Sequence, residues 1–108
     1  MILQIVTFPD APAQPAETIL ADARATVARW QSEGELVSKT YARRDDGAMV
    51  GLYVWKSRRR AEETHDAAWA EAAFRRMGVR PQISYADVFM VVDNASGTVG
   101  EWPLNDAI

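Results

Sequence analysis

The sequence predicts a single α+β domain of the ferredoxin-like kind, built on an antiparallel sheet with the element order βαββαβ. With 108 residues the chain has room for one hydrophobic core, because two cores would each be too small to be stable alone. Hydrophobic residues make up 48% and charged residues 25%, which is the balance of a folded globular protein. Short apolar, β-branched segments alternate with segments of helical periodicity, and this alternation predicts the element order.

The first half of the chain predicts a strand, a helix and a second strand. Residues 1–8 are apolar almost throughout, which is typical of a strand buried on both faces. Prolines then predict a loop over residues 9–16, because proline cannot take part in regular pairing. From residue 17 to Gly34 apolar side chains recur at helical spacing, which predicts one helix with one buried stripe. Its members are Leu20, Ala23, Val27 and Trp30. Residues 36–44 predict the second, more polar strand.

The second half begins with a predicted hairpin and a second helix. The Asp-Asp-Gly sequence at 45–47 is a turn signal, and the strand that follows it, 49–55, is apolar on both faces and therefore central. Ser57 is placed to cap a helix that runs to Met77 and is closed by Gly78. The predicted inward stripe of this helix consists of Ala61, His65, Ala68, Trp69 and Ala72.

Residues 83–92 predict the fourth strand. In the split βαβ arrangement the first and third strands are central, whereas the second and fourth lie at the edges. Residues 88–92 are nevertheless apolar on both faces, although an exposed edge usually carries charges or proline. We therefore expect a second copy of the same sheet to cover this strand, which gives a homodimer with the two sheets face to face. The predicted domain spans residues 1–94, and the tail 95–108 is expected to pack on the partner subunit.

Charge and composition argue against several classes of protein. The formal net charge is -3 and the pI about 5.1, which disfavours a basic face for nucleic acid. Because there is no cysteine, there is no disulfide and no Cys-ligated metal site, which fits a cytoplasmic protein. We expect neither a signal peptide nor membrane insertion, since no segment has the required charge pattern or the roughly 20 apolar residues of a membrane span. The motifs of nucleotide-dependent enzymes, serine hydrolases and zinc enzymes are also absent.

Several segments, taken together, resemble a known family. They are the opening MILQIVTF before a proline-rich loop, the strand LVSKTY, the junction GLYVWKSRRRAEE, Trp69 in the second helix, and the ending MGVRPQISYADVFMVVDN. Their order and spacing, from Met1 to Asn94, resemble the dimeric α+β barrel proteins and, within them, the YdhR-type group of monooxygenases. The tail from residue 95 onward is not covered by this resemblance.

The resemblance implies a barrel made from two sheets, with each subunit's pocket between its own curved sheet and its helices. It also implies a monooxygenase that oxidises a small hydrophobic or aromatic molecule, such as a polycyclic phenol, with molecular oxygen and without cofactor or metal. The protein would deprotonate or orient an electron-rich substrate, which then reacts with oxygen itself. The alternatives are a non-catalytic protein that binds a hydrophobic molecule, a purely structural dimer, and haem degradation. Haem degradation is weakened because related barrels use a first-strand asparagine, where this chain offers Gln4.

His65 is the candidate catalytic residue. It is the only histidine, and histidine is the side chain that titrates near neutral pH when it is unperturbed. Its spacing puts it on the inward stripe of the second helix, one turn before Trp69. Three roles are open: a core histidine hydrogen-bonded to a backbone or tyrosine oxygen, a pocket residue that contacts or deprotonates the substrate, and a metal or haem ligand.

Further side chains are candidate substrate contacts. Trp55 and Trp69 are large apolar residues that either fill the core or line a pocket. Tyr41 and Tyr85 lie on the second and fourth strands, where a phenol can hydrogen-bond a substrate oxygen or lie at a dimer contact. Lys39 shares a strand face with Tyr41, so it either holds a phenolate or carboxylate beside an apolar cavity or stands as a solvated edge lysine.

Overall fold

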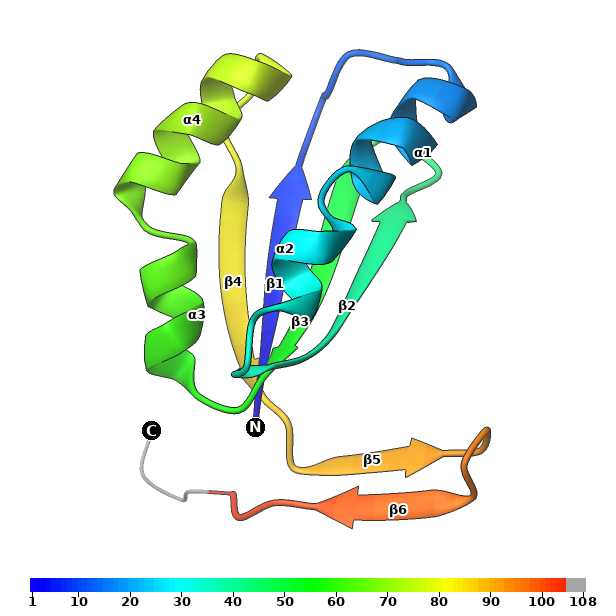
Figure 1. The fold of residues 1–108 in the computed structure, drawn as a ribbon, viewed down its shortest axis with the longest axis vertical. Helices are drawn as coiled ribbons and strands as arrows, with labels where there is room; N and C mark the ends of the chain where they lie inside the picture. The colour runs from blue at the N-terminus through cyan, green and yellow to red at the C-terminus, as the bar shows by residue number, and fades with distance from the viewer. Residues whose placement is uncertain (105–108) are drawn as a thin grey trace.

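The computed structural model describes residues 1–104; residues 105–108, the end of the predicted tail, lie outside the described part. Its elements follow the order βαββαβ, with each helical segment divided in two and a short hairpin added at the end (Figure 1). In chain order they are β1 (Ile2–Phe8), α1 (Ala16–Arg24), α2 (Val27–Gln31), β2 (Leu36–Arg43), β3 (Met49–Trp55), α3 (Arg58–Thr64), α4 (Ala67–Met77), β4 (Gln82–Asp87), β5 (Met90–Asp93) and β6 (Thr98–Glu101). None of the helices in this part of the chain has the length and apolar character needed to cross a membrane.

The main sheet is antiparallel with the strand order β2-β3-β1-β4, which confirms the predicted ferredoxin-like fold with the first and third strands in the centre. Both helical segments cover the same face of this sheet. Trp30 of α2 contacts the ring of Tyr53 on β3, and Gln4 of β1 reaches the backbone of Ala61 in α3 from that same face. The helices and this sheet face therefore enclose the core between them (Figure 1).

The predicted first helix is in fact two helices, α1 and α2, separated by a turn that contains Thr26. The Thr26 hydroxyl donates to the carbonyl of Ala23 at 2.8 Å, so a side chain competes here with helical hydrogen bonding. The predicted stripe is wrong at Leu20 and Val27, which are 50% and 40% exposed. Of its members only Trp30 is fully buried, because the turn changes which side of the segment faces the sheet.

The predicted second helix is also interrupted, because His65 leaves helical geometry with φ −114° and ψ 57°. Ser57 caps α3, as predicted. Asp66 then starts a new helix by accepting a hydrogen bond from the backbone N–H of Trp69 at 2.8 Å, a typical role for aspartate. Gly78 closes α4 in the left-handed region with φ 77°, which confirms the predicted helix end.

The restart of the helix resets its inward face. Ala68 and Ala72, both predicted to point inward, are exposed, so the predicted stripe is wrong at these positions. The inward side chains of α4 are instead Trp69, Ala73 and Met77, which are four residues apart and lie one above the other.

The predicted strand 83–92 is wrong in its second half, because β4 ends at Asp87 and β5 belongs to a separate hairpin. β4 pairs with β1 as far as Asp87, which lies opposite Ile2. β5 pairs instead with β6, which comes from the predicted tail. Figure 1 shows this hairpin projecting from the end of the sheet.

Among residues 1–104, two polar side chains, Gln4 and His65, are buried together with the apolar core. Its buried hydrophobic members are Val6, Trp30, Tyr53, Trp55 and Ala61. Gln4 is 0% exposed, and both ends of its amide are used. Its Nε2 donates to the carbonyl of Ala61 and to the Tyr85 hydroxyl, each at 3.2 Å, while its Oε1 accepts from Nε1 of Trp55 at 2.9 Å. One side chain therefore joins β1, β3, β4 and α3.

We expect Gln4→Leu to lower the free energy of unfolding by roughly 1–3 kcal/mol, because it leaves the buried Nε1 of Trp55 without an acceptor. Urea denaturation, followed by tryptophan fluorescence, measures the loss. Trp55→Phe removes that donor, so the double variant should lose less stability than the sum of the two single variants. Strictly additive losses would show that the two side chains are not coupled.

Candidate functional site

His65 lies at the junction of α3 and α4, inside a set of rings that we call the aromatic box: Trp30, Tyr53, Trp55 and Trp69. The imidazole is stacked on Trp30, with the two planes 2° apart. It meets Tyr53 and Trp69 edge to face, at ring-centre distances of 4.6 and 4.4 Å. Residue 65 is only 5% exposed, so α2, β3 and α4 together build a nearly complete wall around one histidine.

The hydrogen bonds around His65 assign its tautomer. Its Nδ1 lies 3.1 Å from the Thr64 hydroxyl oxygen. That hydroxyl has a single proton, which it directs to the backbone carbonyls of Arg60 and Ala61, each 3.0 Å away. This arrangement favours the tautomer in which Nδ1 carries the ring proton and donates it to Thr64, and in which Nε2 has a free lone pair. Nε2 is buried and has no hydrogen-bond partner among the described residues.

The protein keeps this histidine uncharged. Burial, and next the positive charge of Lys39, lower the pKa of His65 to about 4. At neutral pH the ring is therefore neutral, and its Nε2 can accept a hydrogen bond or a proton but cannot donate one. Such a group suits the orientation or deprotonation of a substrate O–H.

Lys39 lies on β2 opposite Tyr53, and its ammonium group contacts three aromatic rings. The Nζ atom lies 3.9 Å from the ring centre of Tyr41, 4.7 Å from that of Tyr53 and 4.9 Å from that of Trp30, which are cation–π distances. Burial, followed by nearby arginines, lowers the pKa of Lys39 to about 8. The ammonium therefore remains the main form at neutral pH, although it is easier to deprotonate than an exposed lysine.

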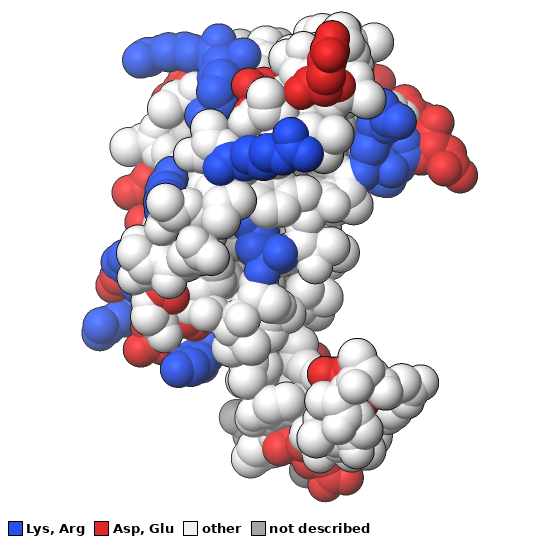
Figure 2. Space-filling model, turned by 45° about the vertical axis from the view of Figure 1, so that its right-hand side comes forward, with Lys and Arg blue, Asp and Glu red and all other residues white. Residues whose placement is uncertain are grey.

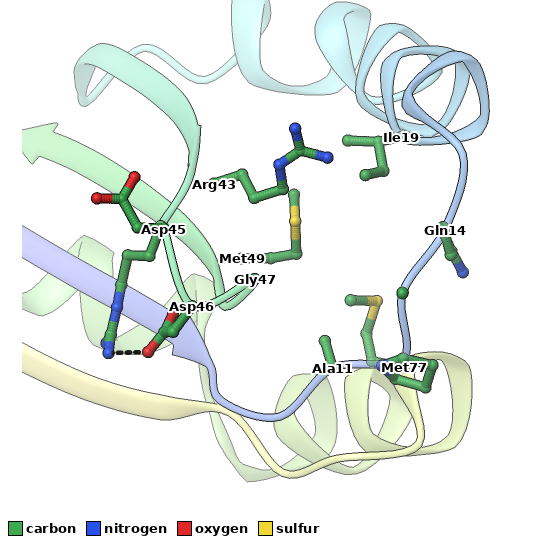
Figure 3. A pocket seen from close by; sticks show the side chains of 12 residues that line it. Ala11, Gln14, Ile19, Arg43, Asp45, Asp46, Gly47, Met49 and Met77 are labelled. Carbon is green, nitrogen blue, oxygen red and sulfur yellow. Dashed lines mark hydrogen bonds and ion pairs between the residues drawn. The ribbon is translucent and has the colours of Figure 1, made fainter.

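A hollow of about 530 Å³, the mouth hollow, opens between α1, the ends of β2 and β3, and α4 (Figure 3). Ile19 contributes from α1, Arg43 and Met49 from the strands, and Met77 from α4. Figure 3 shows the Arg43 side chain directed towards Ile19, with Met49 beside it. The loops before α1 and after β2 complete the rim. This space exists because α1 has no fully buried residue and so is not packed tightly on the sheet.

Aromatic contacts connect the mouth hollow to the aromatic box. Met49, in the wall of the hollow, lies opposite Phe8 in the β1–β3 pair. The ring centre of Phe8 lies 6.3 Å from that of Trp69, which in turn contacts His65. Neither Trp69 nor His65 lines the hollow itself; the half-buried Trp69 is the nearer of the two along this chain of contacts.

A second hollow, the β2-edge hollow, has a volume of about 370 Å³. Its lining consists of Val27, Trp30 and Gln31 from the α2 segment, and of Leu36, Val37, Ser38, Lys39 and Tyr41 from β2. Trp30 thus has two roles, because it stacks on His65 and also forms a wall of this hollow.

The predicted site residues do not surround one common pocket. Trp69 contacts the histidine in the aromatic box, whereas Lys39 and Tyr41 line the β2-edge hollow. Trp55 is 0% exposed, so its indole supports the box from within the core. Tyr85 accepts the hydrogen bond from the buried glutamine and lies under the guanidinium of Arg58, 4.5 Å from its ring centre. Across residues 1–104, no group of three or more His, Cys, Asp or Glu side chains is placed to hold a metal ion.

Three side chains at the site carry little signal in the sequence. Trp30 fits a helical stripe, and only the tertiary fold makes it the stacking partner of His65. Gln4 is a polar residue inside an apolar strand, which is the available hint of a buried hydrogen-bonding role. Arg43 ends an edge strand, where an arginine is ordinary, so its place in the mouth hollow could not be inferred from spacing.

We expect His65 to make stability depend on pH between about 4 and 6.5. The unfolded histidine binds its proton below its ordinary pKa of 6.5, whereas the folded one does so only near pH 4. The stabilising contribution is therefore complete above pH 6.5 and is lost as the pH falls through 4, by on the order of 3 kcal/mol in all. Urea denaturation across this range should show that His65→Gln removes this part of the pH dependence.

The same expectation can be tested without a variant. The chain has one histidine, so a proton NMR titration follows the imidazole of His65 without overlap. We expect a midpoint far below 6.5 in the folded protein; a midpoint at the ordinary value would mean that the ring is solvated and the box open.

No protein family and no curated protein matches the sequence. Solved structures with a similar fold include a candidate antibiotic biosynthesis monooxygenase from Deinococcus radiodurans, at 16% identity and a TM-score of 0.57, covering 86% of this chain and 97% of that one. A monooxygenase from the ActVA-Orf6 gene of Streptomyces coelicolor was solved with the ligand nanaomycin D. It is 24% identical with a TM-score of 0.57, and the match covers 81% of this chain and 86% of that one. Rv0793 from Mycobacterium tuberculosis is 16% identical with a TM-score of 0.56, and the match covers 99% of this chain and 98% of that one. The chain thus shares the α+β fold of these solved structures.

Proposed function

We propose that the chain is a cofactor-independent monooxygenase that oxidises a small hydrophobic or aromatic molecule, in particular a phenol. The observation that carries this proposal is Nε2 of His65, a buried acceptor nitrogen without a partner, on an uncharged ring inside the aromatic box. An unmatched buried polar atom costs roughly 1–3 kcal/mol, which favours a role in ligand contact over a purely structural one. The Streptomyces coelicolor monooxygenase, which shares the fold and was solved with nanaomycin D, supports the same class of activity.

In this proposal the substrate enters through the mouth hollow and stacks against Trp69. The hollow has the volume of a small-molecule site, for which roughly 300–1,000 Å³ is typical, and its walls include the apolar side chains of Ile19, Met49 and Met77. Trp69 is half-buried and contacts His65, so it offers a ring to the ligand on the route to Nε2. Trp55 and Tyr85 support the site through Gln4.

The pKa values define what His65 can do. A phenol has an ordinary pKa near 10, about six units above that of His65 in the folded protein. Complete proton transfer to the resting ring would therefore be unfavourable by roughly 8 kcal/mol. His65 accordingly accepts a hydrogen bond from the substrate O–H and takes the proton only as the substrate gives up electrons to oxygen. The positive charge of Lys39 favours the phenolate that develops.

The oxygen chemistry needs no further reductant. When an anthrone is oxidised, its CH₂ group becomes a carbonyl group. One atom of O₂ enters that carbonyl, and the other leaves as water with both hydrogens of the carbon. The electrons lost by the carbon reduce both oxygen atoms. The chain has to supply orientation, an apolar enclosure for O₂, and the acceptor nitrogen for the hydroxyl proton.

A non-catalytic protein that binds a hydrophobic molecule is the second candidate. It is favoured by the closure of the aromatic box, in which Tyr53 and Trp55 are 3% and 0% exposed, and by the absence of His65 from the lining of either hollow. A ligand held against Trp69 would then never reach Nε2. Haem degradation lacks comparable support, because Gln4 is fully engaged in the core.

The proposal includes the YdhR-type subgroup and a cytoplasmic location. The subgroup is supported by the sequence segments from Met1 to Asn94 that resemble it. The cytoplasmic location is supported by the absence of cysteine from the chain.

We also propose that the chain acts as a homodimer with the two sheets face to face. Leu3 and Ile5 of β1 lie opposite Val54 and Leu52 of β3, on the sheet face away from the core. None of these side chains is fully buried in a single chain. Burying such an apolar face against a second copy would be favoured by roughly 25 cal/mol per Å².

The β5–β6 hairpin supports the same arrangement. A two-stranded hairpin is only marginally stable in water on its own, so it calls for a further contact. Its large apolar side chains are 41–64% exposed: Phe89, Met90, Val91, Val92 and Val99. Figure 2 shows the hairpin as the lower lobe of the molecule, largely uncharged with a few acidic residues. Residues 81–108 contain no lysine or arginine, so an acidic side chain added to the hairpin would have no cation beside it in this segment.

The enzyme proposal is tested with His65→Gln, which keeps an amide for hydrogen bonding but removes the basic imidazole. Oxygen-electrode traces with an anthrone or a dihydroxynaphthalene, without added metal or flavin, should show oxygen consumption by the unaltered chain. The variant should lose turnover by roughly 10²–10⁴-fold, the usual effect of one acid–base group. It should remain folded, as judged by its melting temperature.

Arg59→Gln, whose side chain is 89% exposed on α3, is the matched control and should keep the full rate. An unchanged rate in His65→Gln, together with a lower melting temperature, would retire His65 as a catalytic residue. Binding heat without oxygen consumption across the whole panel would favour the non-catalytic candidate.

Sedimentation at micromolar concentration should give about twice the 12.0 kDa chain mass. Val92→Glu should weaken the dimer by at least about tenfold, because it puts a charge into the proposed contact. The monomer should stay folded, since Val92 is 64% exposed in the single chain. Thr18→Glu, on the exposed side of α1, is the control and should leave the mass unchanged. A monomeric unaltered chain would rule out the barrel arrangement.

A further inference from the structure

Lys39 is a cation that donates no hydrogen bond to any of residues 1–104. Its Nζ has three donor hydrogens, yet none of the hydrogen bonds or ion pairs in the described part of the chain involves them. The atom is held by the rings of Trp30, Tyr41 and Tyr53 and faces the β2-edge hollow, which its side chain lines. The rings stabilise the charge, but they supply no hydrogen-bond acceptor.

The β2-edge hollow also has a positive electrostatic character. No aspartate or glutamate lies among its lining residues. Arg29 is not a lining residue, but its guanidinium lies 4.6 Å from the ring centre of Trp30 and so adds a second positive charge near this wall. The nearby Glu33 does not neutralise them, because it pairs with Arg60 at 2.8 Å. An anion placed in this hollow would meet positive charge without a competing carboxylate.

The remaining walls specify the rest of the ligand. Most of them are aromatic or aliphatic, and Gln31 and Ser38 are the polar members. Several are solvent-exposed in the single chain: Val27 at 40%, Val37 at 50% and Tyr41 at 41%. A phosphate group is usually held by several charged donors at once, whereas Lys39 is the one charged residue in the lining of this hollow. Its volume of about 370 Å³ lies within the range of small-molecule sites. A single negative charge on a flat apolar body matches this combination best.

We propose that the β2-edge hollow is a binding site for a small aromatic carboxylate, whose carboxylate oxygens accept hydrogen bonds from Nζ of Lys39 while its ring lies between Trp30 and Tyr41. This site is separate from the mouth hollow and does not depend on the oxidation proposed above. The carboxylate ligand needs no hydroxyl group and undergoes no reaction there.

The test uses 2-naphthoate as the probe, with calorimetry on the intact chain. We expect binding that is at least about tenfold weaker in Lys39→Met, which keeps the length of the side chain but removes the charge. Lys39→Arg should retain most of the affinity. The control is Lys56→Met, because Lys56 is the only other lysine and is exposed, and this variant should bind like the unaltered chain. The neutral analogue 2-naphthalenemethanol should bind at least about tenfold more weakly than naphthoate.

Methyl NMR locates the probe. Naphthoate should shift the methyl signals of Val27 and Val37 at the β2-edge hollow, and leave those of Met49 and Met77 at the mouth hollow unchanged. Shifts confined to the methionines would place the anion at Arg43 and overturn the proposal. It is equally overturned if naphthoate does not bind, if the neutral alcohol binds as well, or if Lys56→Met loses as much affinity as Lys39→Met. The oxygen-consumption assay is run without naphthoate and with His65→Gln, so its outcome is distinguishable from that of this test.

Discussion

The buried amide of Gln4 is the interaction on which the rest of the structure depends. It lies on the central strand β1 and uses both ends of its side chain, towards Trp55 of β3, Tyr85 of β4 and the backbone of α3. A buried amide is stable only when such bonds are complete, so it fixes the position of every group that it contacts. The carbonyl that it binds belongs to Ala61, which also accepts from the backbone N–H of His65. The placement of the histidine thus follows from the same contact.

The interruption of the second helix gives His65 its chemical character. In a continuous helix both the N–H and the C=O group of His65 would form helical hydrogen bonds. Here His65 ends α3 and Asp66 begins α4. The imidazole can therefore lie across the helix junction, with its Nδ1 against Thr64 and its Nε2 inside the aromatic box. Burial and the charge of Lys39 both disfavour the protonated ring, so the two effects reinforce each other. The result is a neutral acceptor in an apolar enclosure.

Packing in this chain is uneven, and the candidate binding surfaces lie where it is incomplete. Trp30 of α2 and Ala61 of α3 are buried in the core. Helix α1 has no buried residue, and the mouth hollow lies between it and α4. The outer sheet face and the β5–β6 hairpin keep apolar side chains exposed in the single chain. A small-molecule site on one side of the sheet and a contact with a second copy on the other are compatible, since they use opposite faces.

By itself the sequence determined the element order, the central position of the first and third strands, and the ends marked by Ser57, Gly47 and Gly78. These features follow from local periodicity, helix capping and turn chemistry, all of which depend on residues that are close together in the sequence. It also brought His65 close to Trp69, although through a continuous helix that does not exist.

Only the tertiary structure decided where the two predicted helices are interrupted and that β4 ends at Asp87, opposite Ile2. It also decided that Trp30 stacks on His65 and that Lys39 contacts the ring of Trp30. Each of these depends on residues distant in the chain. β4 pairs with β1 only as far as Asp87, and the charge state of His65 is set by rings and a lysine from other elements. The burial of a side chain and the pairing of strands distant in sequence depend on the folded chain, so they cannot be predicted from a local sequence pattern.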